Sequence, residues 1–340
     1  MNLKSPSKYN IGIVGTNFGL KTVAPAILKS NAFNLVCVAD SSPGIPIDHF
    51  LESTIIKTDL NSLLTDPKID IVWIATPSGT HLELVERALL SGKKVVCEKP
   101  AGRTSQETKE LSLLSRNLRL PIFVDFEFRY DPIYTSIFEI ASQIPKNQTF
   151  KIVVTWKTLA KTIRQHEVGP RPIFLDFGIH VFDCLLDFGK QIDSLFVEAS
   201  EVVGICSICQ ASSQNCLLAN LSFARFSATV VICRNYDGLG THQIDLHSQG
   251  SLTCSGITQP YSSNDLFLYQ KQGENPEKYI NNLHKVDLYF SDMRRYSISL
   301  LLLDIENFLS NTKSDVVPPS VDDALRVHEV IDTIVRTETN

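Results

Sequence analysis

The stretch at residues 71–100 constrains the fold of this chain more than any other. It begins with a short apolar run from Ile71, which Pro77 and Gly79 stop, and this pattern predicts a buried parallel strand. Apolar residues then recur at helical spacing over residues 82–91, and Gly92 closes that helix. A second apolar run at residues 94–97 completes a βαβ unit whose two strands point the same way.

Polar turns follow both strands of this unit. Ligands of open parallel sheets bind outside the carboxyl ends of the strands, so both turns are candidates for a binding site. A solvated loop is the alternative for a Glu-Lys-Pro sequence that stands alone. The candidate residues are Ala75, Thr76, Pro77 and His81 after the first strand, and Glu98, Lys99 and Pro100 after the second.

The first forty residues have the layout of a dinucleotide-binding βαβ unit, with strands at 9–14 and 33–39 and a helix at 20–30. The glycines of the first turn allow a pyrophosphate to approach the backbone, and the helix start supplies N–H groups for it. Asp40 follows the second strand and would accept hydrogen bonds from a ribose. A tight turn without a ligand is the alternative. The turn consists of Gly15, Thr16, Asn17, Phe18 and Gly19.

The pattern of elements changes after residue 122. Before it, six strand segments alternate with helices, which predicts an α/β domain at residues 1–122, a Rossmann-type doubly wound parallel sheet. After it, strands follow one another at hairpin spacing, which predicts an α+β domain at residues 123–340 with an open, mainly antiparallel sheet and helices on one face. The expected strands of that second domain are at 150–156, 195–203, 216–226, 229–233, 243–247, 251–254 and 265–269.

A second group of polar residues lies at positions 174–183. Asp176 and His180 are four residues apart, so on a helix they share one face, and Asp183 lies about one turn further along. The alternative is structural, with Asp176 as a helix N-cap and His180 as a packed core histidine.

Together these motifs resemble one family, the Gfo/Idh/MocA oxidoreductases. The Ala-Thr-Pro turn at residues 75–77 and the Glu-Lys-Pro turn at 98–100 are that family's two most specific signatures, and residues 176–183 match its Asp-x-Gly-x-His-x-x-Asp motif. The resemblance implies that Lys99, Asp176 and His180 are catalytic residues beside the nicotinamide. It also implies a homodimer or homotetramer that forms through the C-terminal sheet.

The chemistry of the reaction accounts for these residue types. Alcohol oxidation moves a hydride to the nicotinamide and a proton to a base, and His180 titrates near neutrality. Lys99 can stabilise the reacting oxygen, and Asp176 can orient a hydroxyl or the imidazole. Either Lys99 or His180 can be the formal acid/base. We therefore expect an NAD(P)-dependent dehydrogenase or reductase that acts on CH-OH groups of a sugar, a cyclitol or a sugar derivative. A reductase of a non-sugar substrate and a non-catalytic NAD-binding regulator are the alternatives.

Three positions refine this expectation. Asp40 predicts NAD(H) rather than NADP(H), because its carboxylate would repel a 2′-phosphate. Asn17 stands where relatives often have glycine; asparagine tolerates left-handed backbone angles, but its side chain occupies space near the pyrophosphate. Arg129 matches a frequent arginine of the family, which could contact the cofactor or the substrate, or could pair with a carboxylate.

A basic stretch precedes the aspartate motif. Lys157, Lys161, Arg164 and Arg171 outnumber the single Glu167 there, in a chain of net charge -5. Arginine suits carboxylate and phosphate, so these residues predict an anionic substrate. A solvated loop is the alternative.

Composition excludes several classes of partner. The negative net charge disfavours nucleic acid, no apolar run approaches the ~20 residues that a membrane span needs, and the N-terminus lacks the apolar core of a signal peptide. Most of the eight cysteines lie in apolar runs, which suits reduced thiols and a cytoplasmic location. Cys206 and Cys209 have metal-ligand spacing but no second pair, so we expect no metal.

Overall fold

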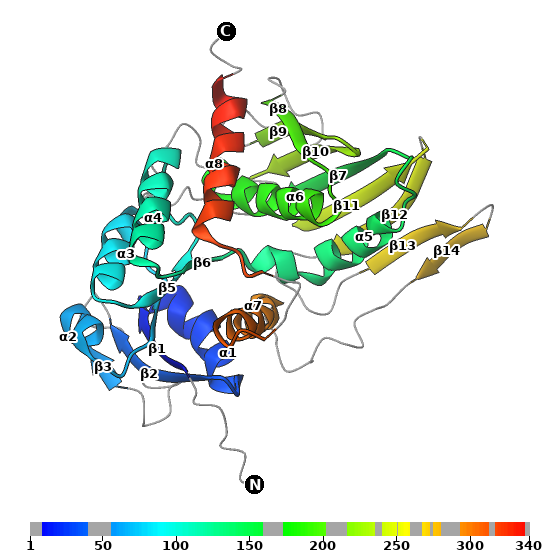
Figure 1. Ribbon diagram of the computed structural model, residues 1–340. Coiled ribbons are helices and arrows are strands. Elements are labelled where there is room, and N and C mark those ends of the chain that lie inside the picture. The colour runs from blue at the N-terminus through cyan, green and yellow to red at the C-terminus, as the bar shows by residue number, and fades with distance from the viewer. Residues whose placement is uncertain are drawn as a thin grey trace. The chain divides into compact units, whose positions relative to one another are not determined.

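The computed structural model describes residues 9–39, 56–158, 173–201, 216–234, 240–249, 251–258, 267–272, 275–279, 293–312 and 317–336. Contacts divide the chain into two compact units. The first comprises Met1–Phe126 and Arg295–Leu325, and the second comprises Glu127–Arg294 and Arg326–Asn340. Each unit is built on a sheet of its own (Figure 1).

The sheet of the first unit has six strands in the order β3-β2-β1-β4-β5-β6. All pairs in it are parallel, so every strand ends at the same edge. The chain leaves β1 toward β3 on one side and then crosses to β4 on the other, which creates a switch point between β1 and β4. The predicted parallel sheet is thus confirmed. Its strands are β1 Tyr9–Val14, β2 Phe33–Ala39, β3 Ile56–Thr58, β4 Ile71–Ile74, β5 Lys94–Glu98 and β6 Ile122–Asp125.

Helices connect these strands, and those expected at 20–30 and 82–91 lie close to their predicted positions. Side chains cap two of them: Asp59 accepts a hydrogen bond from the backbone of Ser62, and Thr104 accepts one from Glu107. Gly92, at φ +77°, follows the helix that it was expected to close. The helix expected at 20–30 opens instead with a turn of π-helix, η1. The helical segments are η1 Gly19–Val23, α1 Ala24–Lys29, α2 Leu60–Thr65, η2 Ser78–Thr80, α3 His81–Leu90 and α4 Ser105–Leu118.

The division of the chain differs from the one expected at residue 122. Strand β6 completes the first sheet, and residues from the C-terminal part of the chain pack against it: Pro319 accepts a hydrogen bond from Val124, and Phe308 meets Phe123 edge-on. Phe308 belongs to helix α7, Met293–Leu309, whose Arg295 donates to the carbonyl of Lys21 at 2.6 Å. Because these contacts join segments far apart in sequence, residues 295–325 belong to the first unit.

The sheet of the second unit has eight strands in the order β14-β13-β12-β11-β7-β10-β9-β8. All pairs except β7 with β10 are antiparallel, which confirms the mainly antiparallel sheet. Strand β14 was not predicted, because its sequence is polar and contains a proline, which is tolerated on an edge strand. The strands are β7 Phe150–Lys157, β8 Phe196–Glu201, β9 Cys216–Phe223, β10 Phe226–Cys233, β11 Thr241–Ser248, β12 Ser251–Thr258, β13 Phe267–Gln272 and β14 Asn275–Tyr279.

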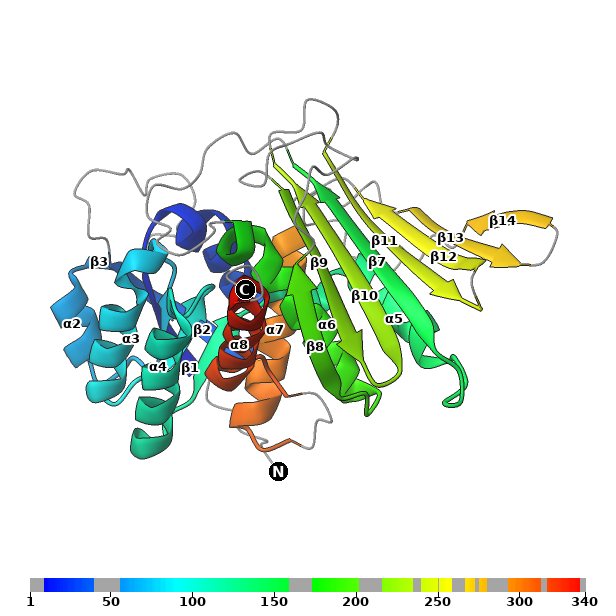
Figure 2. The ribbon, with the colours of Figure 1, turned by 90° about the horizontal axis from the view of Figure 1, so that it is seen from above.

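Two helices lie along one face of this sheet, α5 Pro132–Ser142 and α6 Ile179–Gln191 (Figure 2). Phe138 of α5 stacks on Phe188 of α6 with ring centroids 4.3 Å apart. Strand β7 alternates buried and more exposed residues, and its buried side chains form the core beneath the helices. Short helical segments precede both helices, η3 Glu127–Tyr130 before α5 and η4 Phe174–Gly178 before α6.

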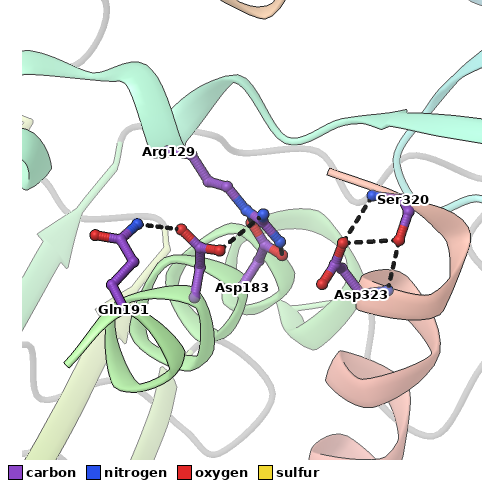
Figure 3. A network of polar contacts seen from close by, with 6 residues as sticks. Arg129, Asp183, Gln191, Ser320 and Asp323 are labelled. Carbon is purple, nitrogen blue, oxygen red and sulfur yellow. Dashed lines mark hydrogen bonds and ion pairs between the residues drawn. The ribbon is translucent and has the colours of Figure 1, made fainter. Parts of the chain in front are cut away.

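The last helix is α8 Val321–Arg336, and Ser320 directly precedes it. The side chain of Ser320 and the side chain of Asp323 exchange hydrogen bonds with each other's backbone N–H groups, as Figure 3 shows. Within the described ranges, no helix has the length and apolarity that crossing a membrane requires.

Candidate active site

The glycine turn after β1 is shaped by close contact with the end of β4. Gly15 has φ +107°, and a Cβ there would lie 2.6 Å from the carbonyl oxygen of Ala75. A Cβ on Gly19 would lie 2.7 Å from Ile13 Cγ2. Glycine is therefore required at both positions, first for the turn and then for close packing of the helix on the strand. These are two of the three roles that glycines have in dinucleotide-binding turns.

Asn17 occupies the remaining position of that turn without strain. It is helical, so the left-handed conformation that favours asparagine is not used. Its Oδ1 atom accepts a hydrogen bond of 2.8 Å from Lys21 Nζ, four residues along the chain. The side chain is exposed and directed along the helix by this contact.

His81 joins the turns that follow β4 and β5. The side chain is almost fully buried, and its Nδ1 and Nε2 atoms lie 2.7 Å from Pro100 O and 2.8 Å from Thr76 O. A neutral imidazole donates only one of these hydrogen bonds, whereas a protonated one donates both. In either form both ring nitrogens face main-chain carbonyls. His81 therefore positions the two candidate turns.

The end of β5 brings Glu98 and Lys99 to the same edge of the sheet. Both side chains are half-buried, and Glu98 is in register with the fully buried Asp125 of β6. Burial raises the pKa of the neighbouring Cys97 thiol well above its usual value, and the two carboxylates raise it further. The first unit thus gathers the predicted residues of all three turns along one sheet edge. Asp40 lies outside the described residues.

The predicted catalytic residues Asp176 and His180 belong to the second unit. Asp176 lies within η4, half-buried, and no side chain caps either η4 or α6. The alternative that Asp176 is an N-cap is therefore wrong. His180 lies in the first turn of α6 and is 3% exposed. Its burial matches the core-histidine alternative, and its role in proton transfer stays a prediction.

Two residues of η3 hold the ring of His180. The imidazole stacks on Phe128 with ring centroids 4.3 Å apart and an angle of 20° between the planes. Its Nδ1 atom lies 3.7 Å from Glu127 Oε2, and both side chains are nearly buried. A carboxylate at this distance stabilises the charge that the imidazole acquires when it takes a proton.

Arg129, which follows Phe128 in η3, pairs with carboxylates of α6 (Figure 3). Its Nη2 and Nε atoms donate to the two carboxylate oxygens of Asp183 at 2.6 and 2.7 Å, and Nη1 donates to Asp187 at 3.0 Å. Of the alternatives for Arg129, the structure shows the carboxylate pair. The last aspartate of the motif thus anchors η3 to the helix that carries His180. Sequence reasoning missed Asp187, although its four-residue spacing from Asp183 places both on one helix face.

A row of rings continues from Phe128 into the sheet. Phe128 packs on Trp156, and Trp156 stacks on His242 with centroids 4.9 Å apart. His242 also lies 3.1 Å from the hydroxyl of Tyr134, and burial lowers the pKa of its imidazole to about 3. His242 is therefore neutral at physiological pH. No sequence motif marks His242, although it occupies an inward position of the alternating strand β11.

The predicted catalytic residues are thus divided between the two units, with Lys99 in the first and Asp176 and His180 in the second. The described residues contain no group of three or more histidine, cysteine or acidic side chains arranged to hold a metal. Several predicted residues lie outside the described part of the chain: Lys161, Arg164, Glu167, Arg171, Cys206 and Cys209.

Comparison with known proteins relates the first part of the chain to a family. Residues 9–126 match the model of the Gfo/Idh/MocA oxidoreductase family, NAD-binding Rossmann fold. An uncharacterized oxidoreductase of Synechocystis is 30% identical over 155 residues, 45% of this chain and 42% of that protein. The chain therefore matches less than half the length of that relative. Myo-inositol 2-dehydrogenase of Thermotoga maritima is 24% identical over 77% of this chain and 75% of that protein.

A solved structure shares the fold over the whole chain. GenD2 from gentamicin A biosynthesis, crystallised in complex with NAD, superimposes with a TM-score of 0.75 at 15% identity and covers 99% of this chain and 96% of its own. The two-sheet architecture is thus shared with that structure over nearly the whole chain, and the family match covers the first sheet. Residues 9–126 belong to the Gfo/Idh/MocA oxidoreductase family, NAD-binding Rossmann fold.

Proposed function

We propose that this protein is an NAD(H)-dependent oxidoreductase that transfers a hydride between nicotinamide and a hydroxyl- or keto-bearing carbon of a sugar, a cyclitol or a sugar derivative. The glycine turn at the switch point between β1 and β4 carries the proposal, because Gly15 packs there against the backbone of Ala75. The name of one relative, myo-inositol 2-dehydrogenase, supports a cyclitol-like substrate class.

The residues of the first unit fit the proposed cofactor. The turn from Gly15 to Gly19 would receive the pyrophosphate, because its glycines leave room beside the backbone. Asp40, directly after β2, would bind the ribose hydroxyls and favour NAD(H) over NADP(H). The turns after β4 and β5, which His81 holds together, would border the rest of the cofactor. When bound, the nicotinamide supplies the hydride acceptor or donor.

The chain's own residues would handle the proton. Nδ1 of His180 faces Glu127, so Nε2 is the atom that would exchange a proton with the substrate hydroxyl. Phe128 fixes the plane of the imidazole, and Glu127 stabilises the imidazolium. Lys99 would hydrogen-bond the reacting oxygen and stabilise its alkoxide character, and Asp176 would orient a neighbouring hydroxyl.

A spectrophotometric screen tests this function. Sugars, cyclitols and their acids and phosphates are offered with NAD and, separately, with NADP, and formation of the reduced cofactor is followed by absorbance. We expect turnover of at least one polyol, with tighter binding of NAD(H) than of NADP(H) in parallel fluorescence titrations. The proposal is wrong if neither cofactor binds. Tighter binding of NADP(H) would overturn the role given to Asp40.

A homodimer or homotetramer through the second sheet is part of the proposal. The face of that sheet away from α5 and α6 includes partly buried apolar side chains such as Leu218, beside buried Val231. The segment around edge strand β8 exposes Leu195 and Val197 by 78% and 63%. Light scattering after size exclusion measures the oligomer, and a monomer at micromolar concentration would contradict it. A cytoplasmic location is supported by the six free, buried cysteines of the described residues.

A further inference from the structure

Arg234 carries a buried positive charge whose partner is absent from the described chain. It follows directly after β10 and is 2% exposed. Its Nε and Nη1 atoms form no hydrogen bond with any described residue. Burying a guanidinium without compensating hydrogen bonds or a counter-charge is costly. An anion at this end of the sheet would supply the missing counter-charge.

A second cation lies at the same end of the sheet. Strands β7 and β10 are parallel neighbours, so both end at one edge, with Lys157 in register with Cys233. The backbone N–H of Thr158 donates to the carbonyl of Cys233 at 2.9 Å, which ties the two strand ends together. Lys157, the last residue of β7, and Arg234, the residue after β10, therefore lie at the same edge of the sheet.

The turn that carries Asp176 lies over this edge. Phe177 meets the ring of Trp156 edge-on, with centroids 4.8 Å apart. The Cζ atom of Arg234 lies 5.8 Å from the centroid of the same Phe177 ring. A Cβ on Gly178 would lie 3.1 Å from a methyl group of Leu217 in β9. Arg234 is thus a neighbour, within the same unit, of the turn from which Asp176 is expected to reach the substrate.

We propose that Arg234 binds a negatively charged group of the substrate, a carboxylate or a phosphate ester. This inference rests on the proposed function and narrows its substrate class to anionic sugars or cyclitols. The planar guanidinium matches both oxyanions with two parallel hydrogen bonds, and the face of Phe177 holds its plane. Lys157 adds a second positive charge at the rim. The contacts of Arg234 favour an anionic substrate without any contribution from Arg164 or Arg171.

Isothermal titration calorimetry on the full chain tests the binding. The probes are glucuronate and myo-inositol 1-phosphate, with glucose and myo-inositol as their neutral counterparts. We expect at least one anion to bind tenfold or more tightly than its neutral counterpart. Arg234→Met should weaken that anion roughly 10- to 100-fold and leave the neutral ligand unchanged. The carboxylate and phosphate arms show which oxyanion the site takes.

Arg225 provides a matched control. It precedes β10 at the opposite end of the strand, about 30 Å away at the usual rise per residue, and its Nη2 donates to Ile144 O at 3.1 Å. Arg225→Met removes the same charge from the same strand and should not change the anion preference. Arg234→Lys keeps a charge without the planar fork and should retain part of the preference.

Thermal unfolding without ligand separates binding from a structural role. If only a ligand compensates the charge of Arg234, the ligand-free Arg234→Met protein should unfold at the same temperature as the wild type or higher. The substitution then removes an uncompensated buried charge. A fall of several degrees, or failure to fold, would show that the chain itself supplies the partner and would overturn the proposal. An Arg234→Met protein that keeps its anion preference would overturn it as well.

The two proposals can fail separately. If polyols are oxidised but neutral ones are preferred, the role of Arg234 is wrong and the oxidoreductase function stands. If anions bind through Arg234 but no substrate reduces or oxidises a nicotinamide, the anion site stands and the proposed function fails.

Discussion

Replacing Arg129 by methionine should destabilise the second unit by about 3–5 kcal/mol, the usual cost of removing one partner of a buried ion pair. Asp183 is 1% exposed and receives two charged hydrogen bonds from Arg129, at 2.6 and 2.7 Å. Each such bond contributes roughly 1.5–3 kcal/mol, and the two are not fully additive. Asp187 loses a third contact, but its side chain is 18% exposed, so water compensates part of that loss.

An exposed ion pair in the same chain is the matched control. Arg87 and Glu83 lie four residues apart on α3, with side chains 38% and 72% exposed. Arg87→Met should cost no more than about 0.5 kcal/mol, because solvent screens the pair. The contrast between the two variants tests burial as the cause, since both remove the same side chain.

Urea unfolding followed by tryptophan fluorescence measures both variants. The chain has two tryptophans, Trp73 and Trp156, so Trp73→Phe leaves Trp156 of the second unit as the reporter. A second substitution, Asp183→Leu, should restore part of the stability that Arg129→Met loses, because it removes the unpaired carboxylate. A loss below about 1 kcal/mol for Arg129→Met would refute the view that this pair anchors η3 to α6.

Three further predictions concern pH and the glycine turn. Burial lowers the pKa of His242 to about 3 from 6.5, so between these values only the unfolded chain binds this proton, and stability should rise with pH. Burial raises the pKa of Asp131 to about 6 from 3.8, so its proton opposes that slope over the range between those two values. His242→Gln should therefore reduce the gain in urea midpoint between pH 6 and 7, and an unchanged gain would contradict the assignment. Gly15→Ala should abolish tight NAD(H) binding and cost about 1–3 kcal/mol, whereas Gly79→Ala, with open space around it, should do neither; equal effects in fluorescence titrations would argue against the turn. Asn17→Gly should tighten NAD(H) binding modestly, and weaker binding would show that the Asn17 side chain donates a useful hydrogen bond.

The first sheet was predictable because its signals are local. Strands β1, β4 and β5 are short, mainly apolar runs that end in glycine, proline or a polar turn, and helices of ordinary length follow them. The glycine turn could be found for the same reason, since Gly15 and Gly19 are needed by the backbone itself. The packing of α7 and Pro319 on the first unit has no local signal and depends on contacts across the sequence.

The sequence proposes the residues of the candidate site but not the side chains that hold them in place. The motif spacing identified Asp176, His180 and Asp183, whereas the partners of these side chains come from another segment. Glu127 and Phe128 hold His180, and Arg129 pairs with Asp183, because η3 docks on α6 through successive residues. Sequence alone left open whether Arg129 contacts a ligand or pairs with a carboxylate. The packing of η3 against α6 shows the carboxylate pair.

Single-turnover kinetics test the central claim most directly. The enzyme is saturated with NAD, mixed rapidly with the substrate found in the screen, and formation of NADH is followed in the wild type, Lys99→Met and His180→Ala. We predict that both variants bind NAD(H) within about twofold of the wild type and reduce NAD roughly 10²–10⁴ times more slowly, the usual effect of removing a proton-transfer group. Unchanged rates of NAD reduction in both variants would contradict the account.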